Sequence, residues 1–232
     1  MLILALETSA ISASCAVLED EKVLAEYFVN NKLTHSKTIM PMVENMLKTA
    51  EVDIKDVDLF AVAAGPGSFT GVRIGIATLK GLAAPFDKPC VGISTLEAMA
   101  QNLAGFHGII CAVMDARCEQ VYNALFESDG KTVKRLCEDR AISINDLKNN
   151  LEAFSKKEII LVGDGADLCY NILYIMKNMK VAPSNIKYQS AFGVAVLAKR
   201  LFDEGNFTNV DNLKPFYLRL SQAERNLKQV EN

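Results

Sequence analysis

The residues best suited to chemistry lie in a glycine-rich stretch, AVAAGPGSFTGVRIG, at positions 61–75. A strand-like apolar run leads into the turn and a helix-like run leaves it, and such a turn offers backbone N–H groups to an anion such as phosphate. The spacing matches neither established phosphate motif, because Val72 stands where a Walker A loop has Lys and Thr70 stands where the dinucleotide motif has Gly. We therefore interpret the stretch as a tight connection, a relic of a phosphate-type loop. The turn consists of Gly65, Pro66, Gly67 and Ser68.

Two acidic residues each end a strand-like apolar run, Glu7 in LALETS and Asp115 in AVMDAR. Actin-like phosphotransferases hold acids at such strand ends near Mg²⁺, which prefers oxygen ligands. Glu7 can equally accept hydrogen bonds from neighbouring backbone N–H groups, and the sequence leaves both interpretations open. We treat Glu7 and Asp115 as relic acidic positions.

Other catalytic constellations are scarce. The two histidines, His35 and His107, fall in different halves of the chain, and neither belongs to a His-x-x-x-His or His-Glu-x-x-His pair. The sequence has no Gly-x-Ser-x-Gly elbow, and no nucleophile has a base that the sequence reveals. We expect no catalytic residue, no metal and no cofactor in this chain.

The composition is that of a folded protein of one large or two small domains, with 232 residues, half of them hydrophobic and 23% charged. The formal net charge of −3 disfavours tight binding of RNA by this chain alone. None of the six cysteines forms a Cys-x-x-Cys pair, and no apolar run approaches the length of a membrane span. We expect a reduced, cytoplasmic protein without a membrane contact.

Apolar periodicity indicates the elements that must position these residues. Two successive β-β-β-α-β-α units are predicted, an order typical of the α/β, duplicated actin-like fold (ASKHA, ribonuclease-H-like). We expect an N-terminal lobe at 1–104 and a C-terminal lobe at 105–232, and the sequence leaves open whether the tail packs back on the N-terminal lobe. The expected strands are 2–6, 12–18, 23–28, 59–63, 90–93, 109–114, 120–126, 132–142 and 158–162, and the expected helices are 36–50, 70–84, one capped by Ser94, 145–154, one reaching Lys177, and 191–204.

Two predicted helices, at 36–50 and 70–84, carry more apolar or small residues than a single core-facing stripe of side chains requires. Methionines widen the apolar surface of the helix at 36–50, and methionine is common at adaptable binding surfaces. Small residues recur at three- and four-residue steps in the helix at 70–84, where each Gly costs about 1 kcal/mol relative to Ala. Such positions favour the close approach of another backbone, either this chain's own sheet or a second chain. The candidate partner-contact residues are Ile39, Met40, Val43, Met46, Leu47, Gly71, Ile74, Gly75, Thr78 and Leu82.

Six segments together resemble the bacterial TsaB (YeaZ-like) family, in the right order and over nearly the whole chain. The most specific is GPGSFTGVRIG together with HS before the first long helix. Cys118 stands where the family usually shows a charged residue, a minor departure. The segments are LALETSAISASCAVL, THSKTIMPMVENML, AVAAGPGSFTGVRIGIATLKGLA, GISTLEAMA, MDARCEQVYNALF and PFYLRLSQAE.

The resemblance implies an actin-like two-lobe fold that has lost its own chemistry. It implies a non-catalytic subunit of the tRNA N6-threonylcarbamoyladenosine (position 37) transferase complex, acting with a TsaD-type catalytic paralogue and a TsaE-type ATPase. It also implies that the helices at 36–50 and 70–84 bind the paralogue, and that tRNA is reached only through the complex. We further expect a homodimer when the chain is alone, since a surface built for a paralogue can pair with itself. The alternative is an actin-like ATPase or phosphotransferase using Glu7 and Asp115.

Overall fold

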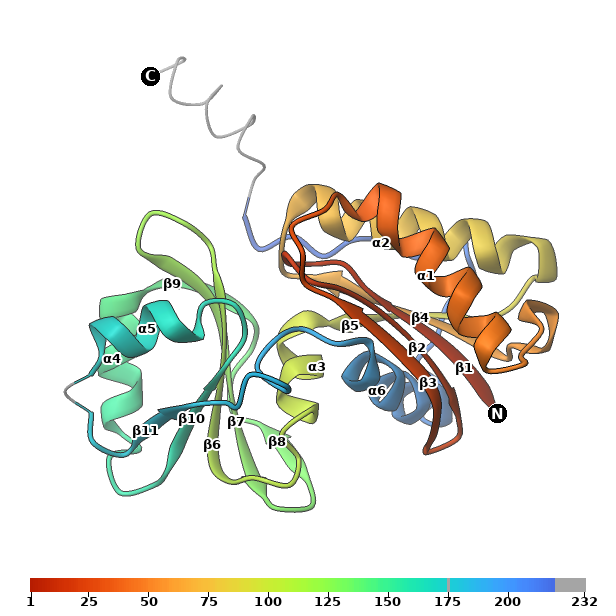
Figure 1. Cartoon of the computed structure of the whole chain (residues 1–232). Helices are drawn as coiled ribbons and strands as arrows, with labels where there is room; N and C mark the ends of the chain where they lie inside the picture. The colour runs from red at the N-terminus through yellow and green to blue at the C-terminus, as the bar shows by residue number, and fades with distance from the viewer. Residues whose placement is uncertain (175, 220–232) are drawn as a thin grey trace, which may run out of the picture.

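The computed structural model describes residues 1–174 and 176–219 and has two α/β lobes (Figure 1). The N-terminal lobe holds a five-stranded sheet in the order β3-β2-β1-β4-β5. β1 pairs antiparallel with β2 and parallel with β4, and β4 is buried along its whole length, as a parallel strand covered on both faces must be. The strands are β1 (Leu2–Glu7), β2 (Ala13–Glu19), β3 (Lys22–Val29), β4 (Leu59–Gly65) and β5 (Cys90–Ser94).

The C-terminal lobe repeats this topology. Its sheet has the order β11-β10-β6-β7-β8, with β9 also paired to β7. The first strand, β6, again pairs antiparallel with the next strand, β7, and parallel with β10, which in turn pairs parallel with β11. The same strand order in both lobes confirms the predicted duplicated, actin-like fold. The strands are β6 (His107–Asp115), β7 (Gln120–Asp129), β8 (Val133–Arg135), β9 (Arg140–Ser143), β10 (Ile159–Val162) and β11 (Met179–Val181).

The single strand expected at 132–142 is wrong, because the structure has β8 and β9 there, each pairing with a different part of β7. The chain leaves the ladder between them, where the Arg135 guanidinium reaches Asp139 at 2.6 Å. Arg135 also binds Glu97 at 2.7 Å, so the interruption serves a contact with a helix of the other half of the chain. Alternating apolar residues cannot reveal such a break.

Helices cover both faces of the N-terminal sheet. Because strand side chains alternate, Leu4 and Leu6 of β1 pack under α1 and α2, whereas Ile3 and Ala5 pack against α6 on the other face. α3 lies between the lobes and covers the face of the C-terminal sheet that α4 and α5 leave open (Figure 1). The helices are α1 (His35–Thr49), α2 (Phe69–Ala83), α3 (Thr95–Gln101), α4 (Ile144–Glu152), α5 (Ala166–Ile172) and α6 (Ala191–Asp203), with short 3₁₀ turns at Ile54–Asp56 and Ala84–Phe86.

Helix starts follow the capping residues of the sequence. Ser68, Ser94 and Ser143 each accept a backbone N–H from the first turn of α2, α3 and α4, respectively. Glu97, three residues after Ser94, could complete a capping box by reaching back to the Ser94 N–H, but its carboxylate binds Arg135 and Arg200 instead. The helix expected to reach Lys177 is wrong in its length, since α5 ends at Ile172 and the chain must turn to enter β11.

The end of the described chain returns to the N-terminal lobe. α6 contacts β1, β2, β4 and β5, and Thr208 forms an isolated bridge with Cys90 of β5. Leu213 belongs to the N-terminal core, and the Phe216 N–H donates to the Ala64 carbonyl at 2.7 Å. The range 105–232 thus contributes to both lobes. Among the described residues, no helix is long and apolar enough to cross a membrane.

Candidate functional site

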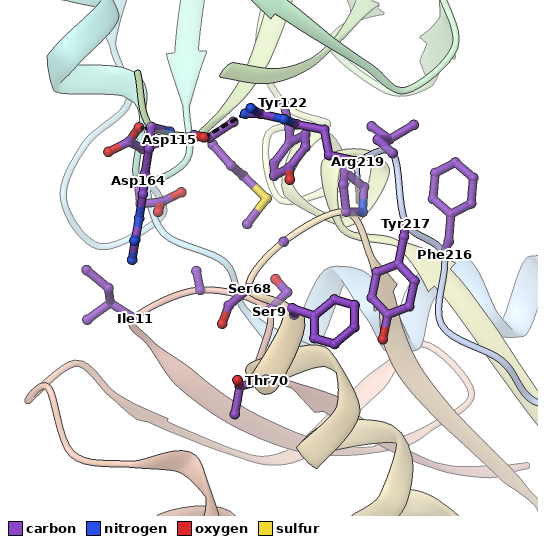
Figure 2. Close-up of a pocket in the computed structure, with 18 residues that line it drawn as sticks. Ser9, Ile11, Ser68, Thr70, Asp115, Tyr122, Asp164, Phe216, Tyr217 and Arg219 are labelled. Carbon is purple, nitrogen blue, oxygen red and sulfur yellow. Dashed lines mark hydrogen bonds between the residues drawn. The ribbon is translucent and has the colours of Figure 1, made fainter. Parts of the chain in front are cut away.

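A cavity of about 510 Å³ lies between the two lobes (Figure 2). The turn after β1 and the glycine turn between β4 and α2 form its wall on one side, and the ends of β6 and β10 form it on the other. Carboxyl ends of parallel strands therefore converge here from both sheets, as at ligand sites of open α/β sheets. Its polar or aromatic lining residues are Ser9, Ser68, Phe69, Thr70, Asp115, Arg117, Tyr122, Asp164, Phe216, Tyr217 and Arg219.

Glu7 is not among the residues that line this cavity. Its side chain is fully buried, and its Oε1 accepts the Ser9 N–H at 2.5 Å while its Oε2 has no protein partner among the described residues. Burial raises the pKa of Glu7 from 4.5 to about 7, with a smaller contribution from the nearby charge of Asp164. The sequence left two interpretations of Glu7 open, and the structure agrees with the one in which its carboxylate accepts a backbone N–H.

Asp115 and Asp164 are the acids that line the cavity. Asp115 is exposed at the end of β6 and accepts the Arg117 N–H at 2.7 Å. Asp164 follows β10, accepts a hydrogen bond from Gln189 Nε2 at 2.8 Å, and has its pKa raised by burial from 3.8 to about 6. Asp164 was not among the predicted site residues, although VGDGADL after an apolar strand is a signal that could have found it. The structure does not bring Glu7 and Asp115 together as an acid pair inside the cavity, because only Asp115 lines it.

The glycine turn is occupied by contacts within the chain. Gly65 has φ +121°, and a Cβ there would lie 2.2 Å from the Phe216 carbonyl oxygen, while a Cβ on Gly67 would lie 2.4 Å from the Ser9 carbonyl oxygen. The Ser68 N–H donates to that same Ser9 carbonyl at 2.7 Å, and the Ser68 hydroxyl accepts the Gly71 N–H. These glycines are needed so that two other backbone segments can approach. The interpretation of the turn as a tight connection fits this geometry.

Segment 216–219 forms a strap across the cavity rim, which the sequence did not predict (Figure 2). Tyr217 stacks on Phe69 with ring centroids 4.5 Å apart and accepts a hydrogen bond from Arg73 Nε at 2.9 Å. Arg219 donates to the Ala116 carbonyl of the C-terminal lobe at 2.8 Å. The strap therefore ties the start of α2 to the β6–β7 turn.

The structure places most of the predicted partner-contact residues of α1 and α2 inside this chain's own N-terminal lobe. Six of the ten lie in this chain's own core, since the face of α1 that carries its apolar stripe packs on the sheet, and α2 approaches the β1–β2 turn. A Cβ on Gly71 would lie 2.1 Å from the Thr8 carbonyl oxygen, and one on Gly75 would lie 2.4 Å from Thr8 Oγ1. The glycine stripe thus serves the chain's own backbone. The six are Ile39, Val43, Met46, Leu47, Gly71 and Gly75.

Four predicted contact residues remain accessible. Met40 is 45% exposed on α1, and Ile74, Thr78 and Leu82 are half-buried on α2. α1 and α2 lie side by side over one face of the N-terminal sheet (Figure 1). Their accessible residues give a narrower surface than the sequence suggested, and we call these four residues the α1–α2 face.

Neither histidine stands in a set of metal ligands. His35 begins α1, and its Nε2 hydrogen-bonds the Ala10 carbonyl at 2.7 Å, which agrees with a role in starting the helix. His107 is exposed at the start of β6. Within residues 1–174 and 176–219, no group of three or more His, Cys, Asp or Glu side chains is arranged to hold a metal ion.

Comparisons with known proteins agree on one family. The family model described as TsaD, tRNA N6-adenosine threonylcarbamoyltransferase, matches residues 22–227. Among curated relatives, the tRNA threonylcarbamoyladenosine biosynthesis protein TsaB of Bacillus subtilis is 32% identical, covering 97% of this chain and 96% of the relative. The protein of the same name from Escherichia coli is 31% identical, covering 98% of each.

Solved structures agree with this result at the level of the fold. YeaZ from Pseudomonas aeruginosa superposes with a TM-score of 0.77 and 24% identity, covering 94% of this chain and 99% of the other. Full-length similarity to the two curated relatives, together with the matching fold, gives the family directly. The chain belongs to the TsaB (YeaZ-like) family.

Proposed function

We propose that this chain is a non-catalytic subunit of the tRNA N6-threonylcarbamoyladenosine (position 37) transferase complex. The observation that carries the proposal is the near-full-length similarity to proteins named for threonylcarbamoyladenosine biosynthesis. The matching family model describes the transferase itself, which supports a relation between this chain and the enzyme as paralogues. The subunit holds a TsaD-type catalytic paralogue in its active conformation, together with a TsaE-type ATPase, in the cytoplasm.

The α1–α2 face is the surface we assign to the paralogue. Its exposed Met40 and half-buried Leu82 offer apolar contact on neighbouring helices, and two related folds commonly pair through equivalent surfaces. The same face accounts for a homodimer when the chain is alone. tRNA is contacted through the assembled complex, in keeping with the net charge of −3.

Reconstitution tests the role of the chain. Modification of adenosine 37 is measured with the purified paralogue and ATPase, with and without this chain, and the rate should fall to background without it. An unchanged rate would contradict the proposal.

A surface substitution tests the interface. Met40→Asp should weaken binding to the paralogue by roughly tenfold or more, because a charge enters an apolar contact. Leu136→Asp is the matched control, since Leu136 is 37% exposed on the C-terminal lobe. If both variants bind as the wild type does, the α1–α2 face is not the interface.

The alternative is an actin-like ATPase or phosphotransferase using Glu7 and Asp115. The cavity lined by Asp115 keeps this alternative testable, whereas the burial of Glu7 outside the lining speaks against the pair. Calorimetry of the purified chain with ATP and Mg²⁺ decides it: tight binding lost in Asp115→Ala favours the alternative over the scaffold role.

A further inference from the structure

A second groove lies along α2, between this helix and segment 211–215. Its volume is about 400 Å³, and Lys80 Nζ crosses it to donate to the Asp211 carbonyl at 3.1 Å. Ile76, Leu213 and Pro215 give it apolar walls. It is separate from the cavity between the lobes, whose lining residues are all different.

The groove is lined mainly by positively charged residues, whereas the whole chain has a negative net charge. Arg73, Lys80 and Lys214 line it, and Asp211 is the one acid among its lining residues. None of the three cations forms an ion pair with a carboxylate within the part of the chain that the structure describes. In a protein of net charge −3, three cations against one acid around apolar walls form a local site of positive potential.

The groove adjoins the α1–α2 face on the same helix. Residues at four- and three-residue steps share a helix face, so Arg73, Ala77 and Lys80 form one strip of α2. Ile74 and Thr78, each one residue further along than Arg73 and Ala77, form the neighbouring strip, rotated by about 100°. A protein that covers the α1–α2 face therefore brings its flank over the groove.

We infer that the groove between α2 and segment 211–215 docks an acidic peptide segment, with apolar side chains between its carboxylates, of the protein that binds the α1–α2 face. The inference rests on the proposed function for the identity of that protein, the catalytic paralogue. Carboxylates pair with the three cations, and apolar side chains enter between Ile76 and Pro215. The apolar walls favour a peptide over a nucleic acid backbone, which has no apolar side chain to place there.

The test changes two of the cations. Lys80→Glu/Lys214→Glu reverses charge in the groove and leaves the Arg73 contacts with Phe69 and Tyr217 in place. The control, Lys131→Glu/Lys134→Glu, makes the same charge change at two exposed lysines of the C-terminal lobe. Thermal unfolding checks that both variants are folded, and Lys80→Gln/Lys214→Gln replaces the first pair if it is not.

Two binding measurements follow. Affinity for the purified paralogue should fall at least tenfold in the groove variant and lose much of its dependence on salt, with little change in the control. A fluorescein-labelled peptide, acetyl-Glu-Leu-Glu-Glu-Leu-Glu, should bind the wild type in low salt and the groove variant far more weakly.

The outcomes separate the inference from the proposed function. Paralogue affinity equal in the groove variant and the wild type overturns the inference and leaves the proposed function standing. If the wild type does not bind the paralogue, the proposed function fails, and failure of the peptide to bind the wild type overturns the inference by itself. A single-stranded oligonucleotide that binds at the groove more tightly than the peptide overturns it in favour of nucleic acid.

Discussion

The first strand of each lobe ends in an acid that accepts a backbone N–H from the following turn, but one acid is buried and the other is exposed. Glu7 ends β1 and accepts the N–H of Ser9, and Asp115 ends β6 and accepts the N–H of Arg117, in each case two residues further on. Yet Glu7 is fully buried, whereas Asp115 is exposed at the cavity. Duplication has preserved strand order and the local turn, while the surroundings of the acid have diverged.

The helix that follows the second parallel strand explains the divergence. In the N-terminal lobe, Gly71 and Gly75 let α2 approach Thr8 closely, and the Ser68 N–H fixes the Ser9 carbonyl above Glu7. The corresponding α5, ADLCYNI, has no glycine within the helix, and a Cβ on its N-cap residue Gly165 would lie 3.0 Å from the Asp115 backbone nitrogen, a looser approach than the 2.1 Å at Gly71. One lobe therefore closes over its acid and the other leaves it open.

The stability of each lobe should depend most on the glycine that ends or follows its second parallel strand, β4 in one lobe and β10 in the other. Gly65 and Gly163 have φ of +121° and +113°, and a Cβ on either would lie 2.2 Å or less from a carbonyl oxygen. Gly65→Ala and Gly163→Ala should each lower the free energy of unfolding by roughly 3–5 kcal/mol, from backbone strain plus a steric clash. Urea unfolding measures the effect.

Gly205→Ala is the control for strain alone, because Gly205 has φ +79° with open space around it. It should cost about 1 kcal/mol. If Gly65→Ala costs no more than this control while Gly163→Ala costs several-fold more, the two turns are not equivalent.

The buried acids at the lobe junction should make stability depend on pH, and Glu7 should contribute the larger part. Because the folded-state pKa of Glu7 is raised from 4.5 to about 7, its contribution is most favourable below pH 4.5 and is lost as the pH rises through 7. The free energy of unfolding should fall by about 2–3 kcal/mol between pH 5 and 8 from this group. Asp164, with its pKa raised to about 6, adds a fall over the lower part of the same range.

Glu7→Gln should flatten this profile, since an amide does not ionise, and leave the smaller fall that comes from Asp164. Urea unfolding of the wild type and the variant at four pH values between 5 and 8 gives both profiles. A variant that keeps the full wild-type fall would contradict the assignment to Glu7.

The close approach of α2 can be broken directly. Gly71→Ala should cost about 2 kcal/mol, because its Cβ would meet the Thr8 carbonyl oxygen and push α2 from the β1–β2 turn. It should also weaken the fall of stability with pH, since water then reaches Glu7. A destabilised variant with the full wild-type pH profile would show that α2 does not control the burial of Glu7.

The smallest change in stability is expected for a substitution on the solvent-exposed side of α2. Gly81 is exposed, and a Cβ there would meet nothing within 4 Å. Gly81→Ala should raise the free energy of unfolding by about 0.5–1 kcal/mol through helix propensity alone. A loss of stability would mean that the outer face of α2 is more constrained than its surroundings indicate.

The sequence predicted the duplicated fold and most element boundaries because apolar periodicity reports burial within each strand or helix. It failed where distant residues decide: Arg135 breaks the strand expected at 132–142 by reaching Glu97 and Asp139, and the turn into β11 shortens α5. The expectation for the glycine turn agreed with the structure, because the spacing already departed from a phosphate motif. The acids at the cavity were only half predicted, since Asp115 lines it and Glu7 does not.

By itself, the sequence determined most of the strands and helices, the duplicated order, and the family. Only the tertiary structure decided which face of each helix is free, because periodicity shows that a helix has a buried side but not what buries it. Ile39 and Met46 carry the apolar pattern of a contact surface, and the N-terminal sheet covers both. The glycines of α2 likewise signalled a close approach, and the Thr8 backbone of this same chain makes it.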